Sequence, residues 1–137
     1  MGIITIQSGA TTITLPEDLQ WGDEFQWSPV GMVTSISLTG ALIIEEAAQL
    51  SGRPITLKST RSGRYYVAPV YRSVVNALRD LSVTTNVTMQ LTLSDARVFS
   101  VRWRHDAGPA FEATPIRLIA PHEDGDYYEI TLKFRQV

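Results

Sequence analysis

Apolar and polar residues alternate along most of this chain, and the longest alternating segment runs from residue 32 to residue 46. A period of two residues is typical of a β-strand, because successive side chains of a strand point to opposite faces of the sheet. An unbroken strand of this length would extend for about 50 Å. Gly40 lies near the middle, so the pattern predicts either one very long strand with a bulge at this glycine or two strands broken near it. The alternation consists of the apolar residues Ile36, Leu38, Leu42 and Ile44 and the polar residues Ser35, Ser37, Thr39 and Glu45.

Shorter alternating segments predict further strands in both halves of the chain. Turn residues separate several of them, as is typical of antiparallel hairpins. Pro115 interrupts one segment, which predicts an edge strand or a bulge at that point. The predicted strands cover residues 55–58, 65–67, 87–93, 99–103, 111–119 and 128–134, with hairpin turns at 62–64 and 94–96.

Residues 68–82 follow a different period. Their apolar residues recur at spacings of three and four, which is the pattern of an amphipathic helix. Pro69 is compatible with the first turn of such a helix. The stripe consists of Val70, Val74, Leu78 and Leu81. The sequence therefore predicts a mainly β domain with one flanking helix.

The composition is that of one globular domain. Of the 137 residues, 44% are hydrophobic and 19% are charged, so we expect a single domain spanning residues 1–137. The net charge of −2 argues against nucleic-acid recognition. The apolar runs are far shorter than the roughly 20 residues of a membrane span, and the first residues lack an export signal, so we expect neither membrane insertion nor export. The absence of cysteine excludes disulfides and thiolate metal sites.

Three small groups of titratable residues lack the arrangement that catalysis or metal binding requires. His105 and Asp106 are adjacent at the end of a predicted strand, and Glu45 and Glu46 are adjacent in another. Neighbouring side chains on a strand point to opposite faces, so neither pair converges on one site. The turn at 122–126 lacks the ligand spacing of a calcium loop, which favours a solvated turn over a metal site. We therefore expect no catalytic residue, no cofactor and no metal.

Arginine accounts for ten of the 12 basic residues. Guanidinium groups pair with carboxylates in two-point contacts and stack on aromatic rings, so arginine is favoured at protein interfaces. Arg102 and Arg104 flank Trp103 on the opposite face of a predicted strand and are candidates to meet carboxylates of a neighbouring subunit. The alternative is an ordinary solvated face. We assign Arg53 to the same class of candidate subunit contacts.

The segment of residues 15–30 combines three large aromatic residues with four carboxylates and fits neither a regular helix nor a regular strand. Aromatic residues in such a segment either anchor it on its own domain or provide the buried anchors of a contact with a partner. Both interpretations stay open at this point. Trp21, Phe25 and Trp27 are therefore candidate partner contacts.

Three strings in the first half of the chain resemble small tail proteins of contractile phages and of phage-derived bacteriocins. They are LPEDLQWGDEFQWSPV at 15–30, SLTGALIIEEA at 37–47 and GRPITL at 52–57. The family is that of the ripcord-type proteins of R-type pyocins and the U-like tail proteins of contractile phages. The second half of the chain is similar to this family in its helix, hairpin and terminal strand.

This resemblance implies a tail-tube-like fold, that is, a small β-barrel or sandwich with one flanking helix and a long extended hairpin or loop. It also implies a non-enzymatic structural protein of a phage tail or pyocin, assembled in the bacterial host cytoplasm. Six copies would form a ring at the distal end of the tail tube. The implied partners are further copies of the chain, the tail tube protein, and the hub and spike proteins of the baseplate.

Two other functions stay open. A distal tail protein of a non-contractile phage would share the core fold and contact a different neighbour. A small carbohydrate-binding β-sandwich would instead use Trp21, Trp27 or Trp103 as platforms on which sugar rings stack.

Overall fold

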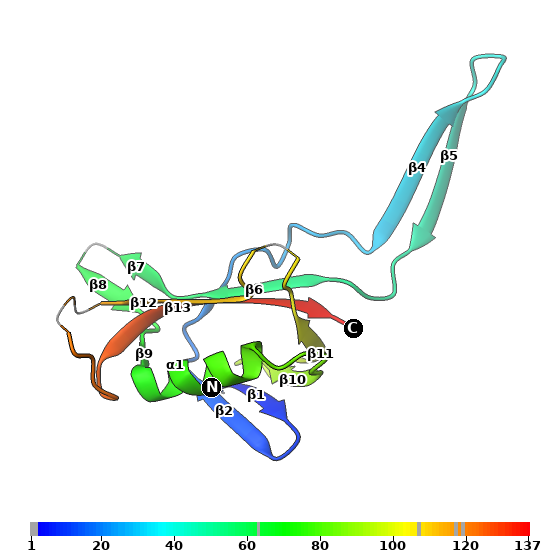
Figure 1. Ribbon diagram of the computed structural model, residues 1–137. Coiled ribbons are helices and arrows are strands. Elements are labelled where there is room, and N and C mark those ends of the chain that lie inside the picture. The colour runs from blue at the N-terminus through cyan, green and yellow to red at the C-terminus, as the bar shows by residue number, and fades with distance from the viewer. Residues whose placement is uncertain (1–2, 63, 107, 117, 119) are drawn as a thin grey trace.

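A computed structural model describes residues 3–62, 64–106, 108–116, 118 and 120–137. Within these residues the chain is mainly β with one short helix, as the alternation predicts (Figure 1). The elements are β1 (Ile4–Ser8), β2 (Thr11–Leu15), β3 (Gln20–Trp21), β4 (Val30–Ile36), β5 (Leu42–Ala48), β6 (Pro54–Lys58), β7 (Thr60–Ser62), β8 (Tyr65–Val67), β9 (Val70–Tyr71), α1 (Arg72–Ser82), β10 (Met89–Thr92), β11 (Val98–Trp103), β12 (Phe111–Pro115) and β13 (Tyr127–Gln136).

The largest sheet is antiparallel and has β13 at its centre. Its strand order is β2-β1-β10-β11-β13-β6-β3, and β12 and β9 also pair with β13. Side chains of β13 alternate between buried and more exposed positions from Tyr128 to Phe134. The strand predicted at 128–134 is therefore confirmed, because its period of two reflects one face on the core and one face toward solvent.

The hydrophobic core lies between this sheet and α1. Leu78 of the helix is fully buried, and Val74 and Leu81 pack against the core while partly buried. Figure 1 shows α1 between the β1–β2 hairpin and the β12–β13 ribbon, and the helix contacts β2, β9, β12 and β13. The apolar stripe of the helix thus covers the apolar side of the sheet.

The helix begins later than the sequence period predicts. Ala68 has a left-handed backbone with φ 59°, and Val70–Tyr71 form β9, which pairs with β13. The prediction of a helix over 68–82 with Pro69 in its first turn is therefore wrong for residues 68–71. Val70 is nevertheless buried beside the helix, so its apolar side chain matches the helical spacing although its backbone is extended.

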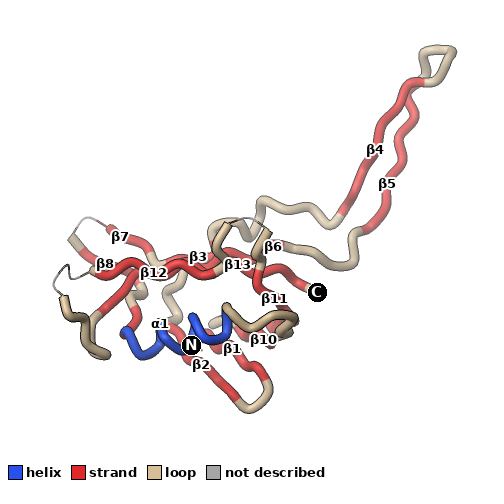
Figure 2. Tube along the Cα trace, in the orientation of Figure 1, coloured by secondary structure: helices blue, strands red, loops and turns tan. Residues whose placement is uncertain are grey.

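Residues 30–48 form a separate two-stranded hairpin, β4–β5, that projects away from the large sheet (Figures 1 and 2). Gly40 lies in the turn with φ 83°, a conformation that favours glycine. The Gly40 N–H donates to the carbonyl oxygen of Ser37 (2.9 Å), and the Ser37 N–H donates to that of Ala41 (2.8 Å). One unbroken strand over 32–46 is therefore wrong, and the alternative of two strands broken near Gly40 is confirmed.

The other predicted hairpins are present. β10 pairs with β11 across a turn in which Ala96 has φ 72°. The hairpin around 62–64 joins β7 to β8, so the expected pairing of 55–58 with 65–67 is wrong, because β6 pairs with β13 and β3 instead. Among the described residues β12 pairs with β13 alone, so Pro115 lies on an edge strand as predicted. The predicted strand extends to residue 119, whereas β12 ends at Pro115, and residues 117 and 119 lie outside the described residues.

Candidate functional site

The β4–β5 hairpin presents apolar side chains that no other strand of the described chain covers. Its two strands pair with each other alone. Seven large apolar residues of these strands are between 42% and 75% exposed, and Leu38 in the turn is fully exposed. An isolated two-stranded hairpin is marginally stable in water, and contiguous exposed apolar surface is typical of interaction sites. The seven residues are Val30, Met32, Val33, Ile36, Leu42, Ile43 and Ile44.

The strand register gives the hairpin two faces of different polarity. Residues directly opposite each other on antiparallel strands point to the same face, and the pairs run from Val30 with Ala48 to Ile36 with Leu42. We call the face of the even-numbered residues the even face and the other one the odd face. The even face holds Val30, Met32, Thr34, Ile36, Leu42, Ile44, Glu46 and Ala48, and the odd face holds Gly31, Val33, Ser35, Ile43, Glu45 and Ala47. The even face is therefore the more apolar one, with a single charged residue.

A groove of about 400 Å³ at the base of the hairpin combines apolar side chains with polar and charged ones. Phe25 and Leu50 are almost fully exposed there, and Trp27 is half-buried beside them. The structure thus places the predicted contact residues Phe25 and Trp27 where a partner can reach them. Leu50 is a third accessible apolar residue, which sequence reasoning missed because nothing in its neighbourhood distinguishes it from a buried leucine.

Trp21 anchors the segment 15–30 on its own sheet. It belongs to β3, which pairs with β6, and it packs against the core while partly buried. Its ring meets Phe99 edge-on, with 5.7 Å between ring centroids. The guanidinium carbons of Arg53 and Arg97 lie 4.6 Å and 5.1 Å from the Trp21 ring centroid. Trp21 and Arg53 therefore act within the chain, and their contact with a partner stays a prediction.

Polar contacts fix the same segment against its surroundings. Arg53 donates to the carbonyl oxygen of Glu24 (2.7 Å), and Arg97 pairs with the carboxylates of Glu24 and Asp95 (2.7 Å each). Hydrogen bonds from the backbone N–H and the guanidinium of Arg97 hold the pKa of Asp95 below its ordinary value. The hydrogen bond to Glu24 raises the pKa of Arg97. Sequence reasoning missed Arg97 because its partner Glu24 lies 73 residues away.

We expect the substitution Asp23→Ala to lower the free energy of unfolding by about 1–3 kcal/mol. Both carboxylate oxygens of Asp23 accept hydrogen bonds from Thr56 of β6, one from its N–H (2.9 Å) and one from its hydroxyl (2.8 Å). Alanine leaves these partly buried donors without their acceptor. Urea unfolding followed by circular dichroism measures the change. Asp18→Ala removes an exposed carboxylate of the same segment, and an equal loss in both variants would contradict the assignment.

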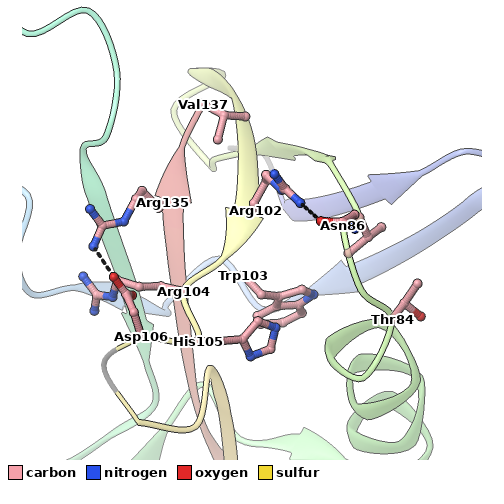
Figure 3. Close-up of a pocket in the computed structure, with 10 residues that line it drawn as sticks. Thr84, Asn86, Arg102, Trp103, Arg104, His105, Asp106, Arg135 and Val137 are labelled. Atoms are coloured by element: carbon pink, nitrogen blue, oxygen red, sulfur yellow. Dashed lines mark hydrogen bonds and ion pairs between the residues drawn. The ribbon is translucent and has the colours of Figure 1, made fainter.

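Arg102, Arg104 and Arg135 line an open cavity of about 400 Å³ at the end of β11 and β13 (Figure 3). Arg102 lies directly opposite Arg135 in the strand register. Like charges directly opposite each other on neighbouring strands are unfavourable. We call these three residues the arginine surface. It contains two of the predicted contact residues, and sequence reasoning missed the third because the register that brings Arg135 beside Arg102 is set by the tertiary fold.

The guanidinium groups of the arginine surface have mostly neutral partners. Arg102 donates to the amide oxygen of Asn86 (2.7 Å), and Arg104 donates to a threonine hydroxyl of β6 (3.0 Å). Among the described residues, Arg135 is the one member of the three with a carboxylate within ion-pair distance. That carboxylate belongs to Asp106 and lies 3.5 Å away. Figure 3 shows Arg104 and Arg135 on the side of Asp106 and Arg102 directed toward Asn86. Three cations with one carboxylate leave this surface positively charged.

The residues considered for catalysis or metal binding do not converge in the structure. His105 and Asp106 are both exposed. His122 Nδ1 lies 3.6 Å from Asp126, whose carboxylate also accepts the N–H of Glu123 (2.8 Å) and so closes the turn. In the described part of the chain, no three histidine or carboxylate side chains are placed to hold a metal ion.

Comparison of the chain with protein-family models, with curated proteins and with solved structures finds no match. The helix α1 has 11 residues, and no helix within the described ranges has the length and hydropathy needed to cross a membrane. The tail-tube-like fold and the phage tail function therefore stay predictions.

Proposed function

We propose that this chain is a structural subunit of a phage tail or of a phage tail-like particle such as a pyocin. Six copies form a ring at the distal end of the tail tube, and the ring joins the tube to the hub and spike of the baseplate. The large antiparallel sheet, its flanking helix and the projecting hairpin support a tail-tube-like fold for this subunit. The resemblance of the strings between residues 15 and 57 to tail proteins supports the same function.

The exposed hairpin is the observation that carries this proposal. A projecting pair of strands with six apolar side chains on one face invites aggregation if it stays uncovered. In a ring or a stack of rings, each hairpin is covered by the next copy through head-to-tail contacts that close with cyclic symmetry. Each seven-residue strand spans about 20–24 Å, whereas a compact body of this size is roughly 30–35 Å wide. The hairpin is therefore long enough to reach across most of a neighbouring subunit.

The other candidate residues have distinct roles in this arrangement. Phe25 and Trp27, at the base of the hairpin, contact a neighbouring subunit or the hub. The arginine surface sets the register between subunits, because charge complementarity selects partner and orientation more than it adds affinity. Trp21 and Arg53 hold the segment 15–30 in place and so position Phe25 and Trp27.

The geometry disfavours the carbohydrate-binding alternative. Trp103 is 7% exposed and stacks on Phe134 with 4.7 Å between ring centroids. Trp21 carries two guanidinium groups over its ring. A sugar platform needs an accessible ring face, which leaves Trp27 alone among the three tryptophans.

A distal tail protein of a non-contractile phage would use the same surfaces. A sheath gene beside the gene for this chain identifies the contractile type.

We expect to find six copies of this chain at the junction of tube and hub in purified tail-like particles. Cryo-electron microscopy of particles from the bacterium that encodes the chain gives its position and symmetry, and quantitative mass spectrometry gives its copy number. Deletion of the gene is expected to yield tubes without an attached hub. Complete, active particles that lack the protein would contradict the proposed function.

A further inference from the structure

Glu46 is the single charged residue on the apolar even face of the hairpin. It lies opposite Met32, with Ile44 and Ala48 two positions away on the same face. Within the described residues Glu46 is exposed and has no ion-pair partner. When a partner covers the even face, this carboxylate leaves water as well. A buried carboxylate is strongly unfavourable unless a cation and hydrogen-bond donors meet it. The partner of the even face must therefore bring a cation to this position.

The arginine surface has the complementary composition. Arg102 and Arg135 lie opposite each other in the strand register. Arg102 has a neutral amide partner and Arg135 has one carboxylate at 3.5 Å, so a further carboxylate would neutralise positive charge that remains on this surface. Arginine forms two-point hydrogen bonds with carboxylates and tolerates removal from water better than lysine does. The wall of the same cavity includes Val87 and Val137. The surface thus offers apolar contacts beside its two guanidiniums, as the even face offers apolar side chains beside its one carboxylate.

The two complementary surfaces are on one chain but face different ways. The hairpin projects from the end of the sheet at which β11 and the C-terminal end of β13 lie (Figure 1). The hairpin points away from the sheet of its own chain (Figure 1). Its even face can therefore reach an arginine surface only on a second copy. Such a contact is head-to-tail, since the hairpin of one copy occupies the body of the next.

We infer that the occupant of the even face is a second copy of this chain, with Glu46 of one copy paired to Arg102 and Arg135 of the next. This inference rests on the proposed function and specifies its subunit contact. Glu45 belongs to the odd face and is not required for the pair. The two adjacent glutamates therefore have different roles although they share charge, strand and exposure.

The test uses the purified full-length chain and charge reversal on each side of the contact. Wild-type protein is expected to sediment as an oligomer in analytical ultracentrifugation. Glu46→Arg, and separately the double substitution Arg102→Glu with Arg135→Glu, should each weaken self-association by at least about 30-fold. An equimolar mixture of the two variants should recover the oligomer, because every contact in an alternating ring then joins opposite charges.

Glu45→Arg is the matched control, and it should associate like wild type. Circular dichroism and urea unfolding show that each variant is folded. Recovery in the mixture supports the inference, since a variant that merely fails to fold cannot be rescued by another. Oligomers of unchanged affinity in Glu46→Arg, equal losses in Glu45→Arg and Glu46→Arg, or a wild-type chain that stays monomeric would each overturn the inference. If the ion pair is overturned but wild-type protein is still found in purified particles, the proposed function stands and the ion pair alone is wrong.

Discussion

Replacing Ile36, Leu42 and Ile44 together by serine should abolish self-association of this chain and leave the free energy of unfolding of the monomeric subunit unchanged. All three side chains lie on the even face and are more than half exposed in the subunit. Burial of one such side chain at an interface stabilises the complex by about 1.5–3 kcal/mol. Their joint loss therefore weakens association by about 5–9 kcal/mol, which is about a thousand-fold or more in the dissociation constant.

Sedimentation of the purified full-length protein measures the association, and urea unfolding measures the subunit. The double substitution Val33→Ser with Ile43→Ser removes apolar side chains from the odd face of the same hairpin, so it controls for a general change in hairpin polarity. We expect the odd-face variant to keep most of its self-association. Wild-type association in the even-face variant, or an equal loss in both variants, would show that the even face is not the contact.

Most of the longer strands could be predicted from this sequence because a period of two is a local property, whereas β1, β2, β3 and β9 were missed. In β13 the even-numbered residues from Tyr128 to Phe134 face the core, and the alternation states this directly. The same alternation in residues 32–46 predicts strand conformation correctly and says nothing about what covers the apolar face. There the face meets no core in the described chain. A sequence pattern thus identifies an apolar face, whereas the tertiary structure decides whether it is a core or an interface.

The errors arise where distant segments determine local structure. Val70 has the spacing of a helical residue, but its pairing with Tyr128 of β13 keeps the backbone extended. Arg102 could be proposed as a contact residue from its place beside Trp103. Its pairing with Arg135 could not, because the two residues are 33 positions apart and meet through the register of β11 with β13. The sequence therefore identified two residues of the arginine surface but did not identify the third.

Phe134→Ala should lower the free energy of unfolding by about 3–5 kcal/mol. Phe134 is fully buried in the central strand, opposite Trp103 on one side and Ile55 on the other, and its ring stacks on Trp103. Alanine loses the transfer free energy of the ring and leaves a cavity that the flanking strands cannot close. Because domains of this size are stable by about 5–15 kcal/mol, the loss is a large share of the total. The midpoint of urea unfolding measures it.

Leu38→Ala removes an apolar side chain of comparable size from the turn of the hairpin, where it is fully exposed. It should change the free energy of unfolding by no more than about 0.5 kcal/mol. Should Phe134→Ala leave no folded baseline, Phe134→Leu retains most of the volume and gives a smaller, measurable loss. Equal unfolding midpoints for wild type and the Phe134 variants would contradict the assigned core. The two apolar surfaces of this chain are thus separable by experiment, because substitutions in the core act on the folding of one copy and substitutions on the even face act on the contact between copies.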